Sequence, residues 1–380
     1  MLKSHRYIFH AISKDLEKKM VFIGGPRQVG KTTLSLQFFK SKASEKNIGY
    51  LNWDYLADRS LILKNQLPLT EPLLIFDEIH KYRNWRSLMK GLFDKYKNSI
   101  RFIVTGSARL DHFRKGGDSL LGRYHYYRLH PLSLMELSKA PNNKDLQNLL
   151  TYSGFPEPFF EKDEKFLRRW QKERVQKVVY EDLRDLETVK EISLIELLVE
   201  TLPSKIGSPL SVKNLAGDLQ VSQPTVARWL TILDNLYLTF RISPYGAPKI
   251  RAVKKEQKIY FWDWTQNDEI GPRFENLVAC QLLKYCHYLE DTEGHKMELR
   301  FLRDTDKREV DFVVLQNKKP LFAVECKTGE RILSNHIKYF SKRTNIPAFY
   351  QVHQGQQDYG KETTGRVLPF VKFCKELGLP

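Results

Sequence analysis

Residues 20–33 read MVFIGGPRQVGKTT, and this stretch decides the fold of the amino-terminal part of the chain. A short apolar run typical of a β-strand leads into Gly25, four further residues, and then Gly30, Lys31 and Thr32. This is the phosphate-binding pattern GxxxxGK(S/T), placed between a strand and a helix as the pattern requires. The alternative is a Gly-rich turn that precedes a core helix by chance, and the order of strand, loop and helix argues against it.

Each residue type in this loop has a physical reason to be there. Glycines allow a tight turn in which successive N–H groups converge on the β- and γ-phosphates of a nucleotide. The helix that follows, expected over residues 32–39, directs the positive end of its dipole at the same phosphates. Lys31 adds a positive charge, and the hydroxyl of Thr32 is suited to bind Mg²⁺.

A second apolar run ends in two acids. Residues 73–78 read LLIFDE, and four consecutive apolar residues are typical of a parallel strand buried on both faces. The carboxyl end of such a strand lies in the crevice where open α/β sheets bind ligands. We therefore expect Asp77 to contact Mg²⁺ through water and Glu78 to orient or deprotonate the attacking water. An isolated Asp-Glu pair is usually a solvated loop start, but the phosphate loop upstream reverses that preference.

A third apolar run, RFIVTGS at residues 101–107, ends in Thr105 and Ser107. Their hydroxyls either sense the γ-phosphate and its water or serve the turn around Gly106, and we weigh the two alternatives about equally.

The first ~130 residues alternate apolar strands with amphipathic helices, as a parallel sheet with crossover helices requires. Arg123 follows Gly122 in a largely apolar and aromatic stretch. It either reaches a γ-phosphate as an arginine finger, in its own subunit or a neighbouring one, or forms a structural salt bridge. The strands are expected at residues 20–24, 48–53, 73–76 and 101–105.

Length and charge bound the remaining possibilities. The 380 residues are enough for two or three domains, each with its own core. With 62 Lys and Arg against 45 Asp and Glu, the net charge is +17, which makes polyanions the expected partners, nucleic acid before membrane. No segment approaches the roughly 18 apolar residues of a membrane span, and no signal peptide is evident. Four cysteines at unrelated spacings favour neither a disulfide framework nor a zinc site, and we expect a cytoplasmic protein.

The middle of the chain predicts helices. Residues 140–205 are expected to be mostly helical, without a catalytic pattern. Residues 211–236 predict a helix-turn-helix, whose exposed Gln223, Thr225 and Arg228 could reach phosphates or base edges.

Residues 237–263 then predict two strands around a basic loop, similar to the wing of a winged helix. Such a module either holds DNA or serves as a protein–protein spacer. The basic residues of the loop are Lys249, Arg251, Lys254, Lys255 and Lys258.

Residues 308–330, REVDFVVLQNKKPLFAVECKTGE, form the second strong pattern, two alternating strands joined by a polar turn. Residues two apart on a strand share a face, so Glu325 and Lys327 point the same way, and Asp311 on the paired strand can lie beside them. Two carboxylates and the carbonyl of Cys326 suit Mg²⁺ or Mn²⁺. The lysine could stabilise the charge of a hydrolysed phosphodiester or help to position water.

Glu275, on a helix expected over residues 271–285, is a possible further acid of the same site. The alternative is an ordinary ion pair between adjacent strands, because such patterns arise often by chance. The apolar surroundings of the three residues favour a nuclease-like fold, while cleavage itself stays open.

The order of these patterns resembles a large prokaryotic family of AAA-type ATPases. Its members have an amino-terminal P-loop domain, a winged helix and a carboxyl-terminal domain of the PD-(D/E)xK nuclease-like kind. The sequences that carry the resemblance are GGPRQVGKTT (24–33), LLIFDEIHKYRNW (73–85), FIVTGSA (102–108), GRYHYYRLHPLSLMEL (122–137), SGFPEPF (153–159), FENL (274–277) and EVDFVV…AVECKTG (309–329).

The resemblance implies Mg²⁺ coordination through Thr32 and Asp77, catalysis of hydrolysis by Glu78 with Lys31, and a metal site at Asp311 and Glu325 served by Lys327. One departure is Val310, which stands before Asp311 where the family pattern has proline. The residues implied to bind ATP are Gly25, Pro26, Arg27, Gln28, Val29, Gly30, Lys31, Thr32 and Thr33.

The predicted architecture is thus α/β: an AAA-type P-loop parallel sheet with helices on both faces, a helical and winged-helix region, and a restriction-endonuclease-like α/β domain. The expected function is an ATP-hydrolysing, DNA-associated protein that forms a homo-oligomer and uses Mg²⁺, with Mn²⁺ possible at the nuclease-like site. The rival predictions are an ATP-gated metal-dependent endonuclease and a non-cutting nucleotide switch. The expected domains are 1–138 (ATPase), 139–205 (helical lid or linker), 206–258 (winged helix) and 259–380 (nuclease-like).

Overall fold

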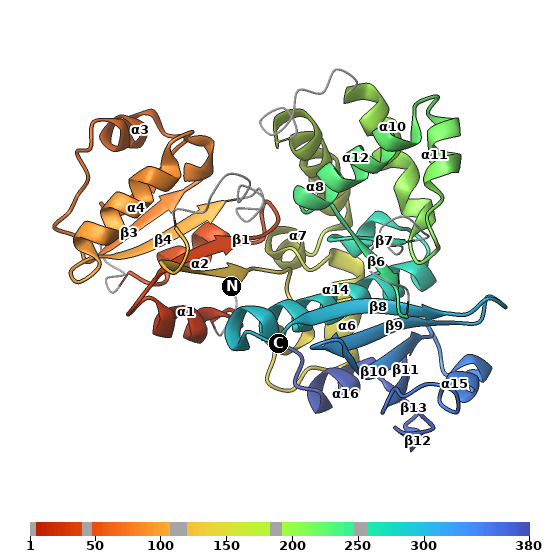
Figure 1. Cartoon of the computed structure of the whole chain (residues 1–380). Helices are drawn as coiled ribbons and strands as arrows, with labels where there is room; N and C mark the ends of the chain where they lie inside the picture. Colours follow the sequence, from red (N-terminus) through yellow and green to blue (C-terminus); the bar gives the residue numbers. More distant parts are fainter. Residues whose placement is uncertain (1–4, 40–47, 107–119, 183–191, 247–256) are drawn as a thin grey trace. The chain divides into compact units, whose positions relative to one another are not determined.

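The computed structural model describes residues 5–39, 48–106, 120–182, 192–246 and 257–380. The chain forms two compact units (Figure 1). The described residues up to His130, with Asn235–Tyr237, form one unit, and those of Pro131–Asp234 and Leu238–Pro380 form the other.

The amino-terminal unit is built on a five-stranded sheet in the order β2-β3-β4-β1-β5, and every neighbouring pair is parallel. This confirms the predicted parallel α/β sheet. The strands β1, β3 and β4 are buried almost throughout, as their continuous apolar runs predict. The bounds are β1 Met20–Gly24, β2 Tyr50–Asn52, β3 Leu73–Asp77, β4 Arg101–Gly106 and β5 Tyr124–Arg128.

The helices of this unit cover the sheet. On α4, the residues Trp85, Met89, Leu92 and Phe93 are buried in the same core cluster as the strand residues Phe22 and Phe76, so this helix presents an apolar face to the sheet. The helices are α1 Phe9–Asp15, α2 Lys31–Leu36, α3 Leu56–Leu63, η1 Ile79–Lys81 and α4 Trp85–Tyr96.

The other unit begins with helices, as the sequence predicts for residues 140–205. They are α5 Leu134–Leu137, α6 Asn143–Tyr152, α7 Pro156–Glu161, α8 Glu164–Lys177, η3 Val178–Asp182, α10 Ile192–Thr201 and η4 Leu202–Lys205. Two further helices, α11 Val212–Asp218 and α12 Gln223–Asn235, occupy the predicted helix-turn-helix. The hydroxyl of Ser211 accepts the N–H of Asn214 at 3.2 Å and so caps α11.

An eight-stranded mixed sheet completes this unit, in the order β12-β13-β11-β10-β9-β8-β6-β7. The long helix α14 Ile270–Glu293 packs on β7, β8, β9 and β10 (Figure 1). The strands are β6 Thr239–Pro244, β7 Lys258–Phe261, β8 Met297–Arg303, β9 Glu309–Gln316, β10 Lys319–Cys326, β11 Phe349–His353, β12 Tyr359–Lys361 and β13 Gly365–Pro369. Its other elements are η5 Trp264–Gln266, α15 Asn335–Phe340 and α16 Phe370–Glu376.

The strands expected to form a wing belong to this sheet. β6 pairs antiparallel with β7 and continues in parallel with β8, where Ser243 lies opposite Arg300. A boundary after residue 258 therefore passes through a single sheet, and the structure differs there from the predicted separate winged-helix domain. The cause is tertiary pairing, because the hairpin finds a hydrogen-bonding partner in β8.

Candidate functional site

The phosphate loop connects β1 to α2 in a backbone conformation that needs glycine. Gly25 has a φ of +149°, and a Cβ atom there would lie 2.4 Å from the main-chain oxygen of Leu129. Gly30 has a φ of +98° and directly precedes α2. Both positions would be strained with any other residue. The two glycines of the pattern are thus required by the fold of the loop itself.

Lys31 lies over this loop and is only 7% exposed. Its ammonium donates hydrogen bonds to the carbonyl oxygens of Gly25, at 3.0 Å, and Pro26, at 2.7 Å. The positive charge is therefore held at the inner side of the turn, where successive N–H groups can also converge on an anion.

The two predicted Mg²⁺ ligands of this unit lie side by side. The hydroxyl of Thr32 donates a hydrogen bond to Asp77 Oδ2 at 2.8 Å, which joins the start of α2 to the end of β3. Thr105, at the end of β4, donates to the other oxygen of Asp77. Tyr50 also donates to Asp77 Oδ2, at 2.7 Å, and burial followed by the charge of Asp77 raises the pKa of Tyr50. A hydroxyl and a carboxylate in contact form a hard oxygen site of the kind Mg²⁺ prefers.

Glu78 follows Asp77 in the left-handed conformation, with a φ of +56°. This is uncommon for a residue other than glycine, although other described residues of the chain, such as Asn65 and Lys162, also adopt it. Its N–H donates to the carbonyl of Thr105 at 3.1 Å, and its carboxylate lies 3.7 Å from His80 Nε2 and 3.9 Å from Lys81 Nζ. Burial lowers the pKa of His80. The role of Glu78 as a base stays a prediction.

Arg6 is a residue of this site that the sequence motifs do not indicate. It is 5% exposed, and its guanidinium donates to the carbonyl of Val29 at 3.0 Å and to that of His130 at 2.5 Å. Because a trans peptide points its C=O and N–H in opposite directions, holding the carbonyl of Val29 fixes the direction of the N–H of Gly30. A lone arginine near the amino terminus carries no sequence signal of this function.

The structure favours one of the two alternatives for Arg123 within its own subunit. Arg123 precedes β5, and its carbonyl accepts the N–H of Met20 at the start of β1. It therefore lies at the edge of the sheet opposite to the phosphate loop. Its guanidinium instead forms a bidentate ion pair with Asp94, at 2.7 and 3.1 Å, so the structural alternative holds here. Ser107 lies outside the described residues.

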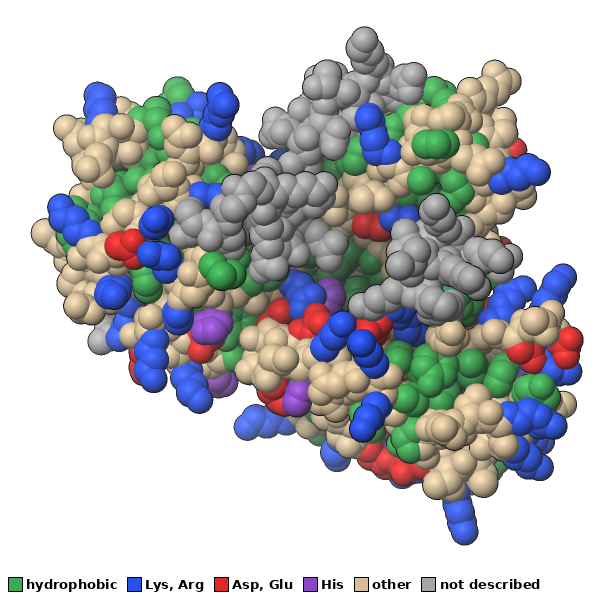
Figure 2. Space-filling model, in the orientation of Figure 1, with side chains coloured by type: hydrophobic (Ala, Val, Ile, Leu, Met, Phe, Trp, Pro, Cys, Tyr) green, Lys and Arg blue, Asp and Glu red, His purple; other side chains and the backbone are tan. Residues whose placement is uncertain are grey.

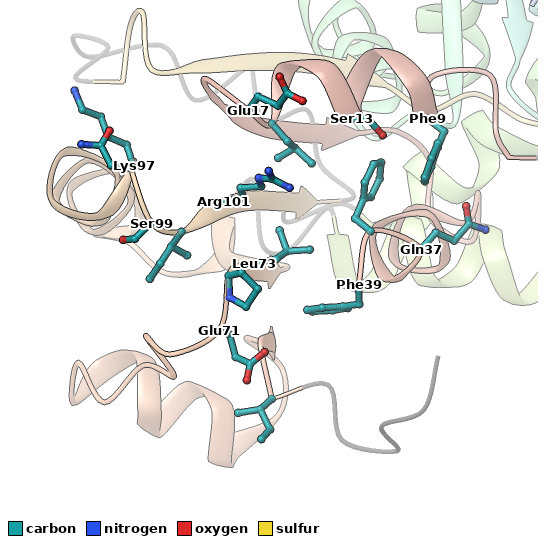
Figure 3. A pocket seen from close by; sticks show the side chains of 16 residues that line it. Phe9, Ser13, Glu17, Gln37, Phe39, Glu71, Leu73, Lys97, Ser99 and Arg101 are labelled. Atoms are coloured by element: carbon teal, nitrogen blue, oxygen red, sulfur yellow. The ribbon is translucent and has the colours of Figure 1, made fainter. Parts of the chain in front are cut away.

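A cavity of about 830 Å³ also lies in this unit (Figure 3). It is lined by Phe9 and Phe39 and by residues at the starts of β3 and β4, including Leu73 and Arg101. The cavity therefore lies at the amino-terminal ends of the strands, whereas Thr32 and Asp77 lie at their carboxyl ends, so the cavity is separate from the phosphate loop.

In the other unit, the predicted acidic site is assembled from β9 and β10. Asp311 Oδ2 accepts the N–H of Cys326 at 2.8 Å, and Lys327 Nζ donates to Glu325 Oε1 at 2.8 Å. Glu325 is 4% exposed, and its second oxygen, Oε2, has no hydrogen-bond partner. Burial and then Asp311 raise the pKa of Glu325 to about 7.

Glu275 and Lys258 join the same cluster. Lys258 was expected in an exposed basic loop, but its side chain is fully buried, which corrects that prediction. Its ammonium lies 3.4 Å from Glu275, 2.5 Å from Glu309 and 3.7 Å from Asp311. Burial opposes the charged form of Lys258, but these three carboxylates outweigh it and raise the pKa of Lys258. Burial and then Asp311 raise the pKa of Glu275 to about 7.

The contacts around Asp311, Glu325 and Glu275 show how far this acidic cluster suits a divalent cation. Among the residues that the structure describes, no group of three or more His, Cys, Asp or Glu side chains is already arranged around a metal position. The buried Oε2 of Glu325 nevertheless has no hydrogen-bond partner, and a hard cation is one group that satisfies such an oxygen. The donor set therefore fits one cation next to Glu325.

The helix-turn-helix has polar residues on its surface. Gln223 and Arg228 are exposed, and Thr225 is partly exposed, while Val226 and Trp229 are buried. On the face shown in Figure 2, the Lys and Arg side chains of the described residues are scattered among other residue types. Lys249, Arg251, Lys254 and Lys255 lie outside the described residues. In the described ranges, no helix has both the length and the apolar character to cross a bilayer.

Three family models match consecutive parts of the chain. Residues 17–138 match an AAA domain, and residues 143–265 and 270–373 match two domains of unknown function, DUF8612 and DUF4143.

The similar curated proteins carry no functional description. The uncharacterized protein MJ1544 of Methanocaldococcus jannaschii is 24% identical over 370 residues, covering 87% of this chain and 81% of that protein. The uncharacterized protein Rv2008c of Mycobacterium tuberculosis is 26% identical over 281 residues, covering 69% and 62%.

Among solved structures, the RuvB Holliday junction branch migration motor of Thermotoga maritima aligns with 62% of this chain and 88% of its own. The identity is 18% and the TM-score 0.31, too low to carry an argument. The sequence match and the phosphate-loop geometry together support an AAA-type P-loop domain at residues 17–138.

Proposed function

We propose that this protein binds and hydrolyses ATP at the amino-terminal unit, with Mg²⁺ held near Thr32 and Asp77. The observation that carries the proposal is the 2.8 Å contact between these two residues, directly beside the glycine loop. Bound Mg²⁺ would neutralise charge on the β- and γ-phosphates. The N–H groups of the loop grip the phosphates, and Lys31 exchanges its carbonyl partners for phosphate oxygens. Glu78 orients a water molecule and takes its proton as ADP and phosphate form.

Nucleotide titration and turnover of variants test this proposal. We expect Lys31→Ala to lose Mg·ATP binding, while Glu78→Gln binds Mg·ATP and hydrolyses it at least about 100-fold more slowly, as removal of a general base does. The matched controls are the exposed residues Lys64→Ala and Glu161→Gln, which should behave as wild type. Normal turnover in Lys31→Ala would overturn the proposal, and normal turnover in Glu78→Gln would move the base elsewhere.

We further propose that the protein associates with DNA through the helix-turn-helix and works as a homo-oligomer. The support is the net charge of +17 and the exposed Gln223 and Arg228 on α12. Binding should weaken steeply with salt. Arg228→Glu should weaken it further, whereas Arg168→Glu on α8, whose side chain is 67% exposed, serves as the control. Equal effects of the two substitutions would redirect attention to another surface. Particle mass with and without ATP and DNA tests the assembly.

Metal-dependent DNA cleavage is a second candidate function, favoured by the unbonded Oε2 of Glu325 beside Asp311. Here Asp311 and Glu325 would hold the cation, and Lys327 would stabilise charge on the phosphodiester. The expected result is Mg²⁺- or Mn²⁺-dependent nicking that disappears in Asp311→Asn and in Lys327→Ala. Nicking that persists in both variants would refute the site, and no nicking with any metal or DNA would favour the non-cutting switch.

A further inference from the structure

Lys258 is the feature of the carboxyl-terminal unit that the proposed functions do not use. It is the first residue of β7, yet its ammonium contacts α14 through Glu275 and β9 through Glu309 and Asp311. The ammonium lies over the ring of Phe301 on β8, with Nζ 5.5 Å from the ring centroid. The charged end is fully buried. A lysine is almost never buried to this degree unless it is paired, and here three separate carboxylates provide the pairing.

The carboxylates of this cluster fall into two groups by their partners. Glu275, Glu309 and one oxygen of Asp311 lie within ion-pair distance of Lys258, and Glu309 also pairs with Arg303 at 3.2 Å. On the other side, Glu325 has Lys327 on one oxygen and no partner on the other. Asp311 is the residue shared between the two groups.

We propose that the buried ammonium of Lys258 occupies the side of this site that faces Glu275 and so restricts the site to one divalent metal ion, bound beside Glu325 and Asp311. A second ion at Glu275 and Asp311 would have to approach a buried ammonium at short range, and the repulsion inside a poorly solvated site is large. Lys258 is therefore a positioning residue: its single ammonium pairs with Glu275 and Glu309 and holds both in place without a metal. The inference rests on the metal site of the second candidate function and is independent of ATP hydrolysis.

Counting bound Mn²⁺ tests the proposal without measuring activity. The full chain is used without nucleotide and in an Asp77→Asn background, so that the phosphate-loop site does not contribute. We expect one Mn²⁺ per chain by calorimetric titration and by electron paramagnetic resonance, and we expect Glu325→Gln to remove it. Lys258→Met, which keeps the length of the stem but removes the charge, should bind two. Adding Glu275→Gln to Lys258→Met should restore one.

Stability measurements provide the matched control. Lys284 on α14 is another buried lysine, 1% exposed and paired with Glu136. Lys258→Met and Lys284→Met should both lower the melting temperature, but Mn²⁺ should raise it by several degrees more in Lys258→Met, which binds two ions, than in Lys284→Met, which binds one. Equal responses of the two variants to Mn²⁺ would contradict the proposal.

Three results would overturn the inference: two Mn²⁺ ions in the wild-type chain, none at all, or one in a folded Lys258→Met variant. If Lys258→Met does not fold, the wild-type spectrum still decides. An isolated Mn²⁺ signal supports the proposal, and a spin-coupled Mn²⁺ pair refutes it. Because ATP turnover and DNA nicking are measured separately, one bound Mn²⁺ without nicking would retain the inference and reject only cleavage.

Discussion

Replacing Arg6 with alanine should weaken nucleotide binding although the guanidinium is not part of the phosphate loop. The side chain is 5% exposed and donates hydrogen bonds to the carbonyls of Val29 and His130. A hydrogen bond from a charged group contributes about 1.5–3 kcal/mol. If the bond to Val29 maintains the loop conformation that receives phosphates, its loss weakens Mg·ATP binding by roughly 10- to 150-fold. The stability loss should be about 3–6 kcal/mol as an upper value, because both carbonyls stay buried.

Tyr7 offers a matched control on the same segment. Its hydroxyl donates to the carbonyl of Arg128 at 2.5 Å and accepts the N–H of His130 at 3.2 Å, and neither bond touches the loop. Calorimetric titration with Mg·ATP, at a temperature where denaturation curves show both variants folded, separates the two effects. Tyr7→Phe should lose stability and keep its affinity. Wild-type affinity in Arg6→Ala, or an equal loss of affinity in Tyr7→Phe, would refute the reasoning.

Three further substitutions test other parts of the structure. Gly25→Ala places a Cβ atom against a main-chain oxygen at a φ of +149°. It should lower the free energy of unfolding by roughly 1–3 kcal/mol and abolish Mg·ATP binding. An alanine variant that binds normally would contradict the loop geometry. Glu136→Gln leaves the buried ammonium of Lys284 without its carboxylate and should lower the unfolding free energy by about 3–5 kcal/mol, so an unchanged urea midpoint would count against a buried pair. Arg123→Ala removes the ion pair with Asp94 but should leave Mg·ATP affinity unchanged; a clear loss in monomeric protein would disprove its position at the opposite edge of the sheet.

The amino-terminal sheet could be predicted because its strands are short and buried on both faces. Such strands appear as continuous apolar runs, and the acid at the end of one run meets the phosphate loop wherever parallel strands end together. The contact between Thr32 and Asp77 therefore follows from local patterns and one general rule of α/β sheets.

The features that the sequence did not predict depend on contacts between residues far apart in the chain. Lys258 stands in a run of lysines and glutamates that is typical of an exposed loop, and only the pairing of β6 with β8 brings it to Glu309 and Asp311. For Arg123 the sequence left a γ-phosphate contact and a structural salt bridge open, and only its place before β5 shows which edge of the sheet it occupies. Arg6 donates to main-chain carbonyl oxygens, which every residue has. The partner residue can therefore be of any type, and no sequence pattern reveals the contact.

The pairing of the β6–β7 hairpin also governs how this protein can be divided for experiments. A fragment that begins at residue 259 would lose β6, so that the outer hydrogen-bonding groups of β8 would face solvent and invite self-association. Ile206 bridges to Ile259, and the N–H of Leu210 donates to Gln257. A soluble carboxyl-terminal fragment must therefore start upstream of Ile206 and carry both helices of the helix-turn-helix with it.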